Sequence, residues 1–194
     1  SIVDRLIYDP DTNRVKGVRV IDTETRETVE FYSKIVFLNA STLGSTQILL
    51  QSASDAFPDG LANSSGTLGH YLMDHHAYIG AMGGISGMKD TFYYGQRPAS
   101  VYIPRFRNVQ RNDQEYLRGF SFENYTGRSD WDRGASQPGL GAEWKESLTK
   151  PGDWWAYFEA YGETLPEFTN QVTLSKTEKD QWGLPVLEVD MAYG

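Results

Sequence analysis

Residues 34–53 read KIVFLNASTLGSTQILLQSA, and the rest of the chain is best interpreted outward from this stretch. Residues 34–40 are almost continuously apolar, which predicts a strand buried on both faces of a parallel sheet. Ser41 and Thr42 can cap a helix predicted over 43–53. Backbone N–H groups at such a helix start favour an anion or the edge of an electron-rich ring. This pattern more often indicates an ordinary buried strand followed by a capped helix, without a ligand site.

The segments on either side of this stretch are mainly β. Upstream, short apolar or alternating segments over 5–8, 16–22 and 27–32 are separated by turn residues, which predicts a β-meander. Downstream, a turn-rich segment over 54–70 precedes strands that we expect at 76–82, 101–105, 117–124, 155–161, 172–175 and 186–190. One helix is expected over 142–148 and a surface loop over 126–141. The predicted fold is α+β: an antiparallel sheet of about six strands with a flanking helix, preceded by the meander and the strand–helix segment.

Composition excludes several classes of function. The formal net charge of −8 disfavours nucleic acid as a partner, because an acidic surface repels phosphate. The absence of cysteine excludes disulfides, thiolate metal sites and a cysteine nucleophile. No apolar run reaches the ~18 residues that a membrane span needs. His75 and His76 are adjacent in a predicted strand and point to opposite faces, so a shared metal is not expected.

Three segments resemble the glucose–methanol–choline (GMC) oxidoreductases. Residues 36–50, VFLNASTLGSTQILL, are similar to the strand, turn and helix that pass close to the flavin in that family. Residues 60–75 look like the stretch that joins the flavin domain to the substrate domain. Residues 170–186, with the pattern Asn-x-Val-x-Leu followed by Lys-Asp-x-x-Gly-x-Pro, resemble a hairpin of the family. The three segments occur in the family's order.

The resemblance implies an internal fragment of an FAD-dependent enzyme that oxidises a CH–OH group of a sugar or other polyol. Residues 1–64 would be part of the FAD-binding domain and 65–194 the substrate-binding domain, with the remainder of the parent chain as partner. The implied cofactor-binding residues are Asn39, Ala40, Ser41, Thr42, Asp74 and His75. No G-x-G-x-x-G turn occurs in the sequence, and the family's catalytic histidine matches no position here. The fragment alone is therefore expected to be inactive. A first residue other than Met and the absence of a signal-peptide pattern also favour a fragment, whereas a complete small domain is the alternative.

Aromatic residues suggest where a substrate would lie. The 12 Tyr, 9 Phe and 5 Trp fall largely in the predicted strands, and aromatic faces stack on sugar rings. Period two places Glu159 on one strand face with a tyrosine on either side. Tyr102, Arg105 and Glu159 are accordingly the candidate substrate-binding residues. A sheet packed with aromatics on one face, or a non-catalytic carbohydrate-binding or interaction β-domain, would give a similar pattern.

Overall fold

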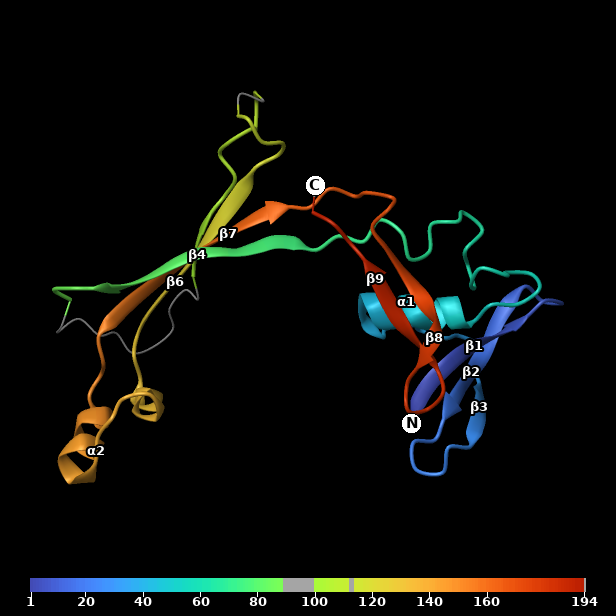
Figure 1. The fold of residues 1–194 in the computed structure, drawn as a ribbon, viewed down its shortest axis with the longest axis horizontal. Coiled ribbons are helices and arrows are strands. Elements are labelled where there is room, and N and C mark those ends of the chain that lie inside the picture. The colour runs from blue at the N-terminus through green and yellow to red at the C-terminus, as the bar shows by residue number, and fades with distance from the viewer. Residues whose placement is uncertain (89–99, 112–113, 194) are drawn as a thin grey trace. The chain divides into compact units, whose positions relative to one another are not determined.

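The computed structural model describes residues 1–88, 100–111 and 114–193 (Figure 1). Two compact units make up the chain. The first combines Ser1–Met73 with Leu165–Gly194, and the second is Asp74–Thr164. Each unit contains antiparallel sheet and helix, so the predicted α+β class is confirmed. Within the described residues, no helix is both long enough and apolar enough to cross a membrane.

The first unit begins with the predicted β-meander. Strands β1 (Ile2–Asp9), β2 (Arg14–Ile21) and β3 (Thr28–Tyr32) pair antiparallel in that order. The β2–β3 turn forms because one carboxylate oxygen of Asp22 accepts the N–H groups of both Glu24 and Thr25, each at 2.9 Å. Such an Asx turn is the local reason why an aspartate stands at this position.

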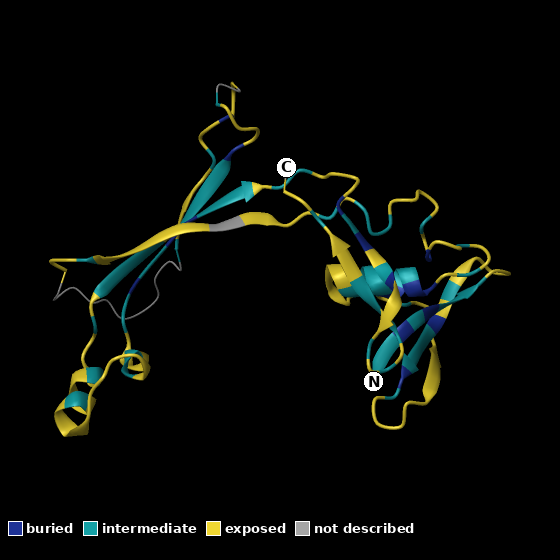
Figure 2. Cartoon of the chain, in the orientation of Figure 1, coloured by how far each residue is buried: buried dark blue, intermediate teal, exposed yellow. Residues whose placement is uncertain are grey.

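A small apolar core holds helix α1 (Ser41–Gln51) against β1. Its buried residues are Leu6, Ile48 and Leu61, and Figure 2 draws buried residues in dark blue. Leu61 also donates its N–H to the carbonyl of Leu49 at 2.9 Å, so the loop after the helix folds back onto it. The core therefore fixes the position of α1 in this unit.

The strand predicted over 34–40 is not formed, which corrects that expectation. Val36 and Leu38 pack on the core, whereas the side chains of Ile35 and Phe37 are exposed, at 67% and 81%. Packed and exposed side chains thus alternate as they do in an extended chain, but among the described residues no strand pairs with this stretch. A strand requires a neighbour for its N–H and C=O groups, and apolar sequence alone does not supply one.

The hairpin of β8 (Gln171–Lys179) and β9 (Pro185–Asp190) completes the first unit and contacts α1. Asn170, whose residue exposure is 3%, anchors it. Its side-chain N–H group donates to the carbonyl of Ala192 at 3.0 Å, and its side-chain oxygen accepts the N–H of Ala192 at 3.0 Å. The backbone of Asn170 also accepts the N–H of Leu72. This asparagine of the quoted pattern thus has a structural role.

The second unit is built on a four-stranded antiparallel sheet. Its order is β4 (His75–Ile85), β7 (Trp154–Glu163), β6 (Phe120–Arg128) and β5 (Val101–Ile103). The six predicted strands all occur, but they do not form one sheet of six, because the last two form a two-stranded sheet in the first unit. Strand periodicity locates strands and does not fix their partners.

The connection from β6 to β7 contains the short 3₁₀ helix η1 (Trp131–Ala135) and helix α2 (Gly141–Thr149). The predicted helix is confirmed, while the predicted loop over 126–141 is partly strand and 3₁₀ helix. The guanidinium of Arg133 donates to the carbonyls of Ser129, Asp130, Ser147 and Lys150. Because the last two belong to the end of α2, a single arginine ties both helical segments together.

Candidate functional site

The start of α1 exposes the first group of predicted cofactor residues. Asn39, Ala40, Ser41 and Thr42 are all exposed. Ala40 is the N-cap and no side chain caps the helix, so Ser41 and Thr42 do not act as caps as predicted. Ser41 adopts φ +64°, a left-handed conformation that is uncommon for a residue with a Cβ. The uncapped N–H groups leave this turn chemically suited to an acceptor.

Asp74 and His75 form the second predicted group, and they open the second unit. Asp74 Oδ1 accepts the His75 N–H at 2.7 Å and lies 3.5 Å from its Nδ1. Both side chains are exposed, at 72% and 74%. The edge of the His75 ring meets Tyr161 with centroids 6.0 Å apart. The carboxylate therefore lies beside the imidazole, while the assignment of both residues to a flavin site stays a prediction.

One face of the four-stranded sheet carries two carboxylates in register. Glu123 on β6 lies directly opposite Glu159 on β7, and Tyr102 on β5 lies opposite Glu123. The predicted residues Tyr102 and Glu159 therefore share a face, with Glu123 between them. We call this surface, with Tyr125, Tyr157 and Tyr161, the carboxylate face.

Tyrosine hydroxyls stabilise the carboxylate face. The Tyr161 hydroxyl donates to Glu159 at 2.8 Å and the Tyr125 hydroxyl donates to Glu123 at 2.5 Å. These bonds offset the repulsion of like charges placed opposite each other. The hydrogen bond to Glu159, with burial second, raises the pKa of Tyr161. The hydrogen bond to Glu123 likewise raises the pKa of Tyr125, so both tyrosines stay neutral donors at ordinary pH.

Arg105 lies apart from Tyr102 and Glu159. Its Nη1 is 3.4 Å from one oxygen of Glu163, and Arg118 Nη1 is 3.2 Å from the other. Glu163 ends β7, four residues beyond Glu159. The structure therefore brings together two of the three predicted substrate residues and gives Arg105 a different partner.

The opposite face of the same sheet is hollowed. A pocket of about 440 Å³ is lined by Ile79, Phe120, Phe122, Ala160 and Gly162, with Tyr116, Leu117 and Gly119 as one wall. Register places the first five on the face away from Glu123 and Glu159. His76 and Glu163 also belong to its lining. We call this the β6–β7 pocket.

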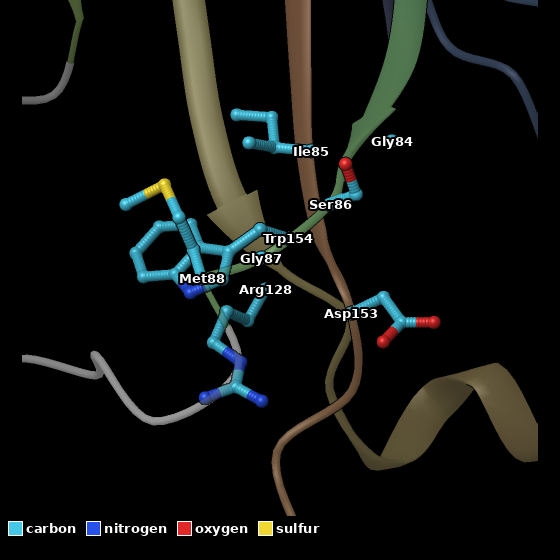
Figure 3. A pocket seen from close by; sticks show the side chains of 8 residues that line it. All are labelled: Gly84, Ile85, Ser86, Gly87, Met88, Arg128, Asp153 and Trp154. Atoms are coloured by element: carbon cyan, nitrogen blue, oxygen red, sulfur yellow. The ribbon is translucent and has the colours of Figure 1, made fainter.

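A second hollow of about 390 Å³ lies at the other end of the sheet and includes Arg128, Asp153 and Trp154 (Figure 3). The Arg128 guanidinium donates to the carbonyls of Gly152 at 2.6 Å and Pro151 at 3.2 Å. In Figure 3 the side chain of Asp153 points away from that of Arg128. The arginine therefore supports the loop before β7. No group of His, Asp and Glu side chains suited to a metal occurs among the described residues.

Sequence reasoning missed three residues of these surfaces: Glu123, Tyr125 and Glu163. The alternation in FSFENY over 120–125 shows that Glu123 and Tyr125 share a strand face. It does not show that Glu123 lies opposite Glu159, because that depends on the β6–β7 register. Glu163 lies outside the predicted strand, which ended at 161.

Comparison with known proteins gives two relatives. No protein-family model matches the sequence. The chain is 34% identical over 185 residues to 2-methyl-1,2-propanediol dehydrogenase of Mycolicibacterium austroafricanum, covering 91% of the chain and 33% of that protein. It is 25% identical over 197 residues to the fructose dehydrogenase large subunit of Gluconobacter japonicus, covering 100% of the chain and 36% of that protein.

The chain thus spans about a third of the length of the curated relatives it matches. The first alignment covers nearly the whole chain, and therefore both of its compact units. The resemblance seen in the three sequence segments is confirmed: the chain is homologous to about a third of two glucose–methanol–choline oxidoreductases.

Proposed function

We propose that the protein carrying this chain is an FAD-dependent dehydrogenase that oxidises a CH–OH group of a sugar or other polyol. The observation that carries the proposal is homology along almost the whole chain to two dehydrogenases, one named for a diol and one for a sugar. In this proposal residues 1–64 are part of the FAD-binding domain and 65–194 form the substrate-binding domain. The chain contributes the sheet that faces the substrate.

The start of α1 supports a role beside the cofactor. Residues Asn39, Ala40, Ser41 and Thr42 are exposed, and no side chain caps the helix. A helix start of this kind fits the electron-rich edge of a flavin ring, because its N–H groups can donate to ring acceptors. The flavin, when bound, would supply the redox chemistry by accepting a hydride. The glycine-rich turn for its pyrophosphate does not occur in this sequence.

Asp74 and His75 are the second part of the cofactor proposal. The carboxylate lies beside Nδ1 of the imidazole, so it can favour a proton on that nitrogen and leave Nε2 as the acceptor. Both side chains are largely exposed and can therefore meet a ligand or another part of the protein. We propose that they orient the cofactor and assign neither as the catalytic base.

The sheet of the second unit offers two surfaces for a substrate. Glu123 on the carboxylate face has acceptor positions beyond its bond from Tyr125, and a polyol has several hydroxyl donors. Tyr102 and Glu159 belong to that surface, whereas Arg105 pairs with a residue of the β6–β7 pocket. Tyr102, Arg105 and Glu159 remain the proposed substrate residues. A variant of each one tests whether the substrate contacts the carboxylate face or the β6–β7 pocket.

A non-catalytic carbohydrate-binding or interaction β-domain is the alternative. The tyrosines and carboxylates of the carboxylate face would suit it. The two functions differ in a simple experiment on the complete protein. A dehydrogenase gives a flavin absorption spectrum that a polyol bleaches without oxygen, whereas a binding domain is colourless and binds the sugar unchanged.

A further inference from the structure

We propose that the β6–β7 pocket binds the hydrocarbon part of a small, branched alcohol and that Glu163, one of its lining residues, accepts a hydrogen bond from the hydroxyl group. This inference rests on the proposed function, extends its substrate class to a small alcohol and favours the β6–β7 pocket over the carboxylate face as the substrate surface. It places the substrate on the opposite face from Glu123 and Glu159. Its evidence is the size of the pocket, its lining and the ion pairs that Glu163 makes with Arg105 and Arg118.

The size and the walls of the pocket suit a compact organic molecule. Its volume of about 440 Å³ falls within the range of about 300–1,000 Å³ that is typical of small-ligand sites. Phe120 and Phe122 meet edge to face with centroids 5.4 Å apart, and Tyr116 lies 5.8 Å from Phe120. These packed rings give the pocket a defined wall.

The floor is made by small residues of β7. Ala160 and Gly162 leave room above the strand, between Ile79 of β4 and the phenylalanines of β6. A Cβ added at Gly162 would lie 3.3 Å from the Cβ of His76, so the floor is already in close contact with its neighbour there. A larger residue at Ala160 would project into the space that we assign to the ligand.

Glu163 is the carboxylate among the residues that line the pocket. Arg105 and Arg118 hold one oxygen each of Glu163, which orients the carboxylate while leaving acceptor positions on both oxygens. The other lining residues with polar side chains are His76 and Tyr116. An alcohol with one or two hydroxyls at one end can satisfy this arrangement. A sugar with a hydroxyl on every carbon would leave several of them against apolar walls, where unmade hydrogen bonds weaken binding.

Residue Ala160 provides a test with a matched control. Ala160→Leu fills the floor of the pocket, and Ala156→Leu makes the same change on the same face of β7, outside the pocket. With the complete protein and an artificial electron acceptor, we expect Ala160→Leu to raise the KM for isobutanol by about tenfold or more. Ala156→Leu should leave it within about twofold. The wild-type protein should prefer isobutanol to sorbitol in kcat/KM.

A second variant keeps the test valid if Ala160→Leu does not fold. The side chain of Leu117 is 74% exposed, so Leu117→Ala should fold normally while it widens the pocket mouth. We expect a higher KM for isobutanol and a lower one for a bulkier alcohol such as neopentyl alcohol. An unchanged ratio between these two alcohols would overturn the pocket assignment.

A binding measurement separates this inference from the proposed function. Saturation-transfer NMR with isobutanol reports contact with the pocket whether or not the protein is an enzyme. Contact that is lost in Ala160→Leu and kept in Ala156→Leu supports the pocket even if no alcohol is oxidised. Oxidation of isobutanol or sorbitol that neither variant alters would support the dehydrogenase and overturn the pocket.

Discussion

The Asn170 side chain offers the sharpest test of how the β8–β9 hairpin is held. Asn170 donates to the carbonyl of Ala192 and accepts its N–H, both at 3.0 Å, from a position that is 3% exposed. Asn170→Ala removes both bonds. Each contributes about 1 kcal/mol net, and water can replace the lost partner because Ala192 is exposed. The expected loss is therefore about 2 kcal/mol.

An isosteric variant adds a dependence on pH. In Asn170→Asp one oxygen still accepts the Ala192 N–H, while the other faces the Ala192 carbonyl and binds well only as a protonated O–H. The folded state therefore raises the pKa of this aspartate above its unfolded value of about 3.9. The stabilising contribution is fully present below the unfolded pKa and is lost as pH rises through the folded pKa.

Hydrogen exchange at the C-terminal segment measures both effects. A loss of about 2 kcal/mol should speed exchange of the Ala192 amide about 30-fold in Asn170→Ala. Asn170→Asp should exchange like the wild type at about pH 3 and like the alanine variant at about pH 7, after correction for intrinsic rates. Thr169→Ala, an exposed neighbour, is the control. Equal exchange protection of the Ala192 amide in the wild type and in Asn170→Ala would refute this role of the Asn170 side chain.

Three further predictions concern other fixed points of the fold. Hydrogen bonds from the N–H groups of Thr25 and then Glu24 lower the pKa of Asp22. The turn should therefore be stable above the usual aspartate pKa of 3.8 and loosen as pH falls through the lowered pKa. Asp22→Asn should remove this pH dependence from the amide NMR spectra. Gly69→Ala should destabilise by more than about 2 kcal/mol in urea unfolding, because its Cβ would lie 2.3 Å from the Val172 carbonyl oxygen at φ +84°. Gly66→Ala, at φ +70° with open space, should cost only about 1–2 kcal/mol, and equal costs would contradict the close contact. Arg133→Met should make 129–150 sensitive to limited proteolysis while the sheet stays intact, and unchanged resistance would show that its four carbonyl contacts are dispensable.

Local structure was largely predictable from the sequence. Short apolar or alternating segments located the strands of the described residues, as with 155–161 for Trp154–Glu163, and the helix expected over 142–148 is Gly141–Thr149. Turn residues explain the meander, because Asp22 builds its turn from local contacts alone. These features depend on residues close together in the chain, so periodicity and turn chemistry suffice.

Pairing between distant segments was not predictable. The apolar stretch over 34–40 suggested a buried strand, but its partner cannot be read from its own residues. The assignment of β8 to the first unit depends on Asn170 and Gly69, which bond to residues remote in sequence. The sequence made Tyr102 and Glu159 candidates, whereas the position of Glu123 between them depends on the register of β6 on β7.

The most direct test of the dehydrogenase proposal is the visible absorption spectrum of the complete protein, recorded without oxygen before and after an alcohol is added. We predict flavin bands that isobutanol or a polyol bleaches and that buffer alone leaves unchanged. A colourless protein, or flavin bands that no alcohol or polyol alters, would contradict it. Sugar binding by a colourless protein would support the non-catalytic β-domain instead.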